Sequence, residues 1–271
     1  MTDPTQLQTH THVFGGRPTQ MLQLGQGPVA VLIHGSADKP TTWLPVMQAL
    51  AGQFQLLAPG LPPIAVEEPA GGRRALDLDL PWLDEVLTLS GARILAAHSY
   101  GALLALRWAL AHPGRLDRLV LIEPICWGMV AGHGTAGQKL DELRDLCLHA
   151  FARGEVESAM HWLVDYWNGQ GFFARLPERI RAGLVTHYGR TWAEVASGGG
   201  DQTSAAEVRT LTMEVQLLAG EHTTPESLAV MRALAAALPR APFQVLPGAT
   251  HQCLKSHAAR VAAAIAGTTQ L

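Results

Sequence analysis

The stretch that decides the fold is ARILAAHSYGALLALRWALA, residues 92–111. Its first part is apolar enough for a buried strand, and its second part, rich in leucine and alanine, predicts a helix. Ser99 stands at the junction, where a sharp turn would lift its side chain off the end of the strand. Such a turn needs very small residues two positions before and after the serine, because the two backbones nearly touch; here these are Ala97 and Gly101. Ser99 is therefore a candidate nucleophile, with a plain helix N-cap as the alternative.

Strands and helices alternate on both sides of this stretch. Further apolar runs predict strands at residues 20–24, 29–33, 55–59, 118–124, 213–220 and 243–247. Helical spacing lies between them, at residues 42–50, 80–90, 226–238 and 254–266. Alternation with nearly continuous apolar strands predicts an α/β fold, in which a mostly parallel sheet is covered by helices on both faces.

The alternation stops within residues 125–210, which carry helical patterns and no convincing strand. We therefore expect a core formed by residues 1–124 and 211–271, and a helical cap (lid) insertion formed by residues 125–210. The insertion should pack over one end of the sheet.

Composition narrows the class of protein. The 271 residues are enough for one large α/β domain with an insertion. A net charge of −3 without any run of Lys or Arg argues against nucleic-acid or membrane binding. Three widely spaced cysteines predict neither a disulfide framework nor a metal site, and they favour a reducing compartment. The N-terminal MTDPTQLQTH does not resemble a signal peptide, so a cytoplasmic location is expected. The low share of charged residues, 16%, also allows a homodimer.

A second motif, His34-Gly35-Ser36, directly follows the strand expected at residues 29–33. Acyl-transfer chemistry needs two N–H groups aimed at the developing oxyanion, and a glycine-containing loop at a strand end can present one. We assign the two donors to the backbone amides of Ser36 and Tyr100, the latter at the start of the expected helix. An ordinary turn is the alternative for this motif.

A general base must reach Ser99 from a loop at the same end of the sheet. His251 fits, because it follows the last expected strand in LPGATHQ, residues 246–252. A solvated loop histidine is the alternative. The nearest competitors are His98, His222 and His257; the side chain of His98 should diverge from the serine at the turn.

These motifs together resemble the α/β-hydrolase fold family. The resemblance rests on HGS, AHSYG and the C-terminal GATH, and on the alternation over residues 20–124 and 213–266. AHSYG departs from the common G-x-S-x-G only by alanine for the first glycine. The resemblance implies a Ser–His–acid triad and a mainly parallel sheet of about eight strands. It also implies a helical cap after the strand that follows the nucleophile helix, where residues 125–210 lie.

The acid of that triad is not at the family's common position. Many members carry an aspartate after the next-to-last strand, and the matching residue in LLAGEHTTP is Thr223. Two carboxylates can replace it: Glu221 on the same loop, and Glu123 at the end of RLVLIEP, a strand on which some members carry their acid. We favour Glu123, because a carboxylate at the end of so apolar a strand needs a partner, and His251 supplies one. Asp201 is a third candidate.

A serine nucleophile, rather than an aspartate, argues against haloalkane dehalogenase and epoxide hydrolase chemistry, and leaves acyl transfer to water. We expect a small, largely apolar carboxylic ester as the small-molecule substrate, with no cofactor and no metal. The residues expected to line its pocket are His34, Trp43, Trp127, Trp162, Trp167 and Phe172.

A competing function is a small-molecule sensor on the same scaffold that keeps the pocket and turns substrate over very slowly or not at all. A nucleotide-binding protein is disfavoured, because the strand expected at residues 29–33 leads into HGSADKP rather than a glycine-rich phosphate loop.

Overall fold

The computed structural model describes residues 6–65, 74–132 and 134–268. Its centre is an eight-stranded sheet in the order β1-β2-β4-β3-β5-β6-β7-β8. Strands β1 and β2 and strands β2 and β4 pair antiparallel, and all the other pairs are parallel. The strands are β1 (Gln8–Phe14), β2 (Arg17–Leu24), β3 (Val29–Ile33), β4 (Gln55–Pro59), β5 (Ile94–His98), β6 (Arg118–Ile122), β7 (Glu214–Gly220) and β8 (Phe243–Leu246).

The seven expected strands are present, and β1 is an additional one. Its sequence, QTHTHVF, has no apolar run, because it is an edge strand whose side chains are mostly exposed. The central strands β3, β5 and β6 are almost entirely buried, which is why their sequences are continuously apolar.

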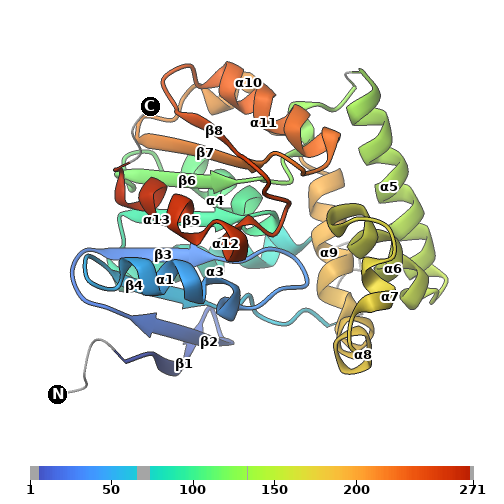
Figure 1. The fold of residues 1–271 in the computed structure, drawn as a ribbon, viewed down its shortest axis with the longest axis horizontal. Helices are drawn as coiled ribbons and strands as arrows, with labels where there is room; N and C mark the ends of the chain where they lie inside the picture. Colours follow the sequence, from blue (N-terminus) through green and yellow to red (C-terminus); the bar gives the residue numbers. More distant parts are fainter. Residues whose placement is uncertain (1–5, 66–73, 133, 269–271) are drawn as a thin grey trace.

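Helices cover both faces of the sheet (Figure 1). Helices α3, α4 and α11 share one apolar cluster with the sheet, and α1, α12 and α13 share the other. The helix expected at 80–90 begins earlier, at Ala75, and the one expected at 254–266 is two helices. The bounds are α1 (Leu44–Leu50), α3 (Ala75–Ser90), α4 (Tyr100–Ala111), α11 (Pro225–Ala237), α12 (Cys253–Ser256) and α13 (Ala258–Ala266).

A group of helices is inserted between β6 and β7 and lies together beside the sheet in Figure 1. Three of these helices, α5, α6 and α9, pack around a third apolar cluster that contains Cys147, Phe151 and Met160. We call this group the cap. Its helices are α5 (Gly134–Ala152), α6 (Val156–Asn168), α7 (Phe172–Arg175), α8 (Glu178–Thr186) and α9 (Tyr188–Gly199), and the short α10 (Ala205–Val208) leads back to the sheet.

None of the helices in the described ranges is both long and apolar enough to cross a membrane.

Candidate active site

The turn between β5 and α4 holds Ser99 in a backbone conformation that side chains rarely adopt, with φ 56° and ψ −122°. Such a conformation persists only where the surrounding structure holds it in place. A Cβ atom on Gly101 would lie 2.4 Å from the carbonyl oxygen of His34, and one on Gly35 would lie 2.8 Å from the Cβ of Ser99. The small residues of both motifs thus let the two strand ends approach each other closely around the serine.

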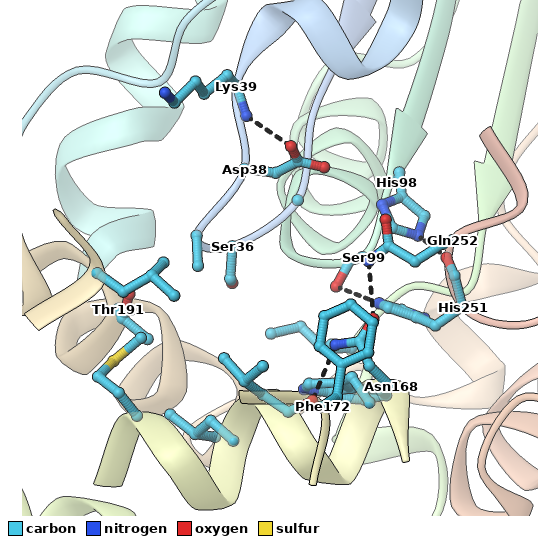
Figure 2. Close-up of a pocket in the computed structure, with 18 of the residues that line it drawn as sticks. Ser36, Asp38, Lys39, His98, Ser99, Asn168, Phe172, Thr191, His251 and Gln252 are labelled. Carbon is cyan, nitrogen blue, oxygen red and sulfur yellow. Dashed lines mark hydrogen bonds between the residues drawn. The ribbon is translucent and has the colours of Figure 1, made fainter. Parts of the chain in front are cut away.

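Three side chains from three strand ends form a hydrogen-bonded chain. The hydroxyl of Ser99, after β5, donates to Nε2 of His251 over 3.3 Å (Figure 2). Nδ1 of His251, on the loop after β8, donates over 2.5 Å to Oε2 of Glu123, which follows β6. All three residues are buried. This order leaves Nε2 free of a proton and directed at the serine hydroxyl, as a general base must be.

Glu123 is held by three donors. Oε1 accepts the amide of Gly220 over 2.7 Å, and Oε2 accepts the hydroxyl of Thr223 over 2.5 Å in addition to His251. Burial raises the pKa of this carboxyl, but the charge and hydrogen bond of His251 and the other two donors outweigh it, so the net pKa is lowered. Thr223, at the family's common acid position, therefore donates to the carboxylate rather than replacing it.

The other two candidate acids lie elsewhere. Glu221 has a side chain that is 54% exposed and accepts the amide of Gly248. Asp201 accepts the amide of Gly128 at the base of the cap. The structure brings neither of them to His251.

The two residues expected to supply oxyanion donors lie on the two turns that meet at Ser99. Tyr100 is the first residue of α4, so its amide has no partner one turn earlier within the helix. Ser36 follows Gly35, which packs against Ser99, and it lines the same cavity as the serine. Both amides are therefore candidates to bind a negatively charged oxygen beside Ser99.

A buried ionic network that the sequence analysis did not identify lies behind this site. Asp79, in α3, accepts the hydroxyl of Tyr100 over 2.7 Å and pairs with Arg190 of cap helix α9 over 2.5 Å. Arg17 also contacts Asp79, at 3.2 Å, and Arg190 pairs with Glu194 at 2.8 Å. The network therefore connects the cap to Tyr100, in the turn that carries Ser99. Asp79 is one of three aspartates in α3, so the sequence alone did not distinguish it from Asp77 and Asp84.

Glu194 is the buried acidic partner of Arg190 in this network. Among the residues that the structure describes, neither of its oxygens has a hydrogen bond of regular geometry, although its pair with Arg190 is close. Burial raises its pKa to about 7, against the opposing effects of Arg190 and of the nearby Ser36 hydroxyl.

The competing histidines have other contacts. His98 donates from Nε2 to the backbone carbonyl of His251 over 3.0 Å, and burial lowers its pKa to about 3. Its ring lies next to that of His251, with centroids 4.5 Å apart. The side chain of His98 thus lies in the cavity wall beside His251, but its Nε2 bonds to a backbone carbonyl and not to Ser99. His222 is exposed, and His257 contacts the carbonyl of Pro247.

The hydrogen-bonded series of Ser99, His251 and Glu123 opens at Ser99 into a cavity of about 530 Å³ between the sheet and the cap. Polar residues on part of its wall include Asp38, Lys39, Asn168, Gln252 and Lys255, several of which are drawn in Figure 2. The rest is mainly apolar. Its apolar lining residues are Ile125, Trp127, Met160, Leu163, Val164, Trp167, Phe172, Leu176, Ile180, Leu184 and Val195.

Trp127, Trp167 and Phe172 thus line the cavity as expected, and three other expected pocket residues do not. Trp43 is fully buried in the core under α1, where apolar packing holds it. The ring of His34 is held by two loops, since it accepts the amide of Leu61 after β4 and contacts the carbonyl of Gly35 in its own loop. Trp162 packs against the apolar cluster of the cap. Within the described ranges, no group of three or more His, Cys, Asp or Glu is arranged to hold a metal ion.

Comparison with known proteins defines the class. The sequence model of the "Alpha/beta hydrolase family" matches residues 30–264, which are most of the chain. The protein therefore belongs to the alpha/beta hydrolase family.

The curated relatives in this class have names that describe different hydrolytic reactions. The chain is 27% identical to the 2-hydroxymuconate semialdehyde hydrolase of Pseudomonas sp. (strain CF600), over 93% of this chain and 90% of that protein. It is 33% identical to the pimeloyl-[acyl-carrier protein] methyl ester esterase of Aeromonas hydrophila, over 53% of this chain and 63% of that protein.

Solved structures support the fold alone. Cfl2 from Burkholderia cenocepacia has a TM-score of 0.70 at 17% identity, over 97% of this chain and 96% of that chain. The carboxylesterase CesB from Bacillus subtilis has a TM-score of 0.66 at 16% identity, over 97% and 93%.

Proposed function

We propose that this protein is a serine hydrolase that cleaves a small carboxylic ester with an apolar acyl group. The observation that carries the proposal is the buried chain from Ser99 through His251 to Glu123, which ends in a largely apolar cavity. A helix N-terminus and a glycine-containing loop meet at the same point, where acyl transfer requires them.

The reaction has two halves. Ser99 Oγ attacks the ester carbonyl while its proton passes to Nε2 of His251, and the amides of Ser36 and Tyr100 bind the oxyanion. Collapse of the intermediate breaks the ester C–O bond, and the protonated His251 gives its proton to the leaving alcohol. Water then attacks the acyl-enzyme with His251 as base, which releases the carboxylic acid and restores the serine hydroxyl. Glu123 holds the histidine in the required tautomer throughout.

The lining of the cavity supports an apolar acyl group. Aliphatic side chains from α6, α8 and α9 form much of its wall, including Leu163, Leu184 and Val195. Burying an acyl chain against them contributes about 0.8 kcal/mol per methylene. The names of two relatives, an esterase of a methyl ester and a semialdehyde hydrolase, also fit hydrolysis at a carbonyl carbon.

The test is the intact mass of wild type and Ser99→Ala after exposure to a fluorophosphonate probe, followed by a panel of p-nitrophenyl esters. We expect one adduct on the wild type and none on the variant, and turnover that rises with acyl length before the cavity is filled. A folded wild type that forms no adduct would contradict the proposal.

The second candidate, a ligand-binding sensor on this scaffold, is favoured by the largely apolar cavity alone. A wild type that binds apolar acids or esters in calorimetry, and turns over no ester, thioester or lactone in the panel, would support it instead.

A further inference from the structure

The last turn of cap helix α6 contacts the elements that surround the proposed general base. The hydroxyl of Tyr166 donates to Glu226 Oε2 at the start of α11, over 3.0 Å. The side chain of Asn168 accepts a hydrogen bond from Gln252, the residue after His251, over 3.1 Å. Figure 2 shows Asn168 and Gln252 beside His251 at this side of the cavity. The cap is therefore attached to the core on both sides of Trp167.

Trp167 itself lies on the ring of His251. The two ring centroids are 4.6 Å apart and the planes differ by 24°, so the rings are stacked. The face of an indole carries negative potential and attracts a cation that lies over it, more strongly than any other aromatic side chain does. His251 becomes such a cation each time it accepts the proton of Ser99.

Other titratable groups also face the ring of His251, and their effects differ from that of the Trp167 face. Glu123 faces the ring from the end of β6. His98 faces it from the end of β5, and burial lowers the pKa of His98 to about 3, so that ring stays neutral and adds no charge. Asp38 and Lys255 line the same cavity.

We propose that Trp167 is a positioning residue that stabilises the protonated ring of His251 through its aromatic face, so that the base is complete only while the end of α6 is docked on the core. This inference rests on the proposed serine hydrolase reaction. It assigns to the cap a part in proton transfer, in addition to its part in enclosing the substrate.

The test is the pH profile of kcat/KM for Trp167→Leu and Trp167→Phe with one p-nitrophenyl ester. Loss of the aromatic face should lower the plateau by about 3- to 30-fold and move the acid limb about half to one and a half pH units lower. Both effects follow because the protonated ring is then less stable. Phenylalanine, a weaker cation binder, should restore part of both effects, and kcat should change more than KM.

Trp192→Leu is the matched control. Trp192 also belongs to the cap, where it packs against Phe151 and does not line the cavity, so its loss should leave the acid limb in place. A Trp167→Leu variant with the wild-type limb, or one in which only KM rises, would overturn the inference while the serine hydrolase proposal stands. A wild type that neither hydrolyses the ester nor reacts with a fluorophosphonate would overturn both.

Discussion

Replacement of Glu123 by glutamine separates the contribution of the carboxylate charge from that of its shape. Oε1 accepts one donor, the amide of Gly220, and Oε2 accepts two, from Thr223 and His251. Glutamine offers only one acceptor oxygen. One of the two sites must therefore receive an NH₂ group that faces another donor, whichever way the amide turns.

Both orientations are unfavourable for different reasons. With the NH₂ group towards Gly220, two donors oppose each other in a buried place, at about 1–3 kcal/mol of folding stability. With the NH₂ group towards His251, Nδ1 must become an acceptor, and its proton moves to Nε2, where the base has to be free. In either case the negative charge that stabilises the protonated His251 is lost. We expect kcat to fall about 10³- to 10⁴-fold, equivalent to about 4–5 kcal/mol of transition-state stabilisation.

The assay is kcat on a p-nitrophenyl ester at pH 8, together with thermal unfolding of the same samples. Glu221→Gln is the control, because that side chain is exposed, accepts the amide of Gly248 and lies 4.0 Å from His222, away from His251. Its kcat should stay within about twofold of wild type, since the change removes no contact of His251. A Glu123→Gln variant that keeps more than a tenth of wild-type kcat, or a Glu221→Gln variant that loses as much, would refute the assignment of the acid.

Three further predictions follow from the same site. The pKa of Glu194 is raised from 4.5 to about 7, so the folded state keeps the proton to a higher pH than the unfolded state does. The free energy of unfolding should therefore fall by about 3 kcal/mol as the pH rises between these two values. Glu194→Gln should lack this fall when urea titrations at pH 5 and pH 8 are compared. An unchanged pH dependence in the variant would contradict this. Gly101→Ala should abolish fluorophosphonate labelling or folding, because its Cβ would lie 2.4 Å from a carbonyl oxygen, whereas Gly183→Ala, with open space around it, should label like wild type. Leu184→Trp should shift the preferred acyl chain of an ester series to a shorter length, and a preference that does not move would place the acyl group elsewhere.

Much of the fold follows from local patterns in the sequence. Continuous apolar runs belong to strands that are buried on both faces, and they identified seven of the eight strands. The small residues around Ser99 likewise indicate a tight turn, because that requirement concerns neighbours in the chain. The edge strand β1 was not predicted, because its sequence has no apolar run. The order of Ser99 and His251 along the chain suggested their roles, which remain predictions until the variants are measured.

Contacts between residues far apart in the chain were decided only by the tertiary structure. Strands β6 and β7 are parallel neighbours, paired at Ile122 and Leu218, and this register places Glu123 beside the loop of Thr223, 100 residues later. The apolar strand before Glu123 favoured it over Glu221, but only the register shows which carboxylate reaches His251. The stacking of Trp167 on His251 and the burial of Trp43 likewise depend on how the cap and helices dock. The sequence by itself thus determined the elements and the nucleophile turn, because these depend on short-range periodicity and sterics. The tertiary structure decided which carboxylate and which aromatic rings surround the histidine, because that depends on strand order and register.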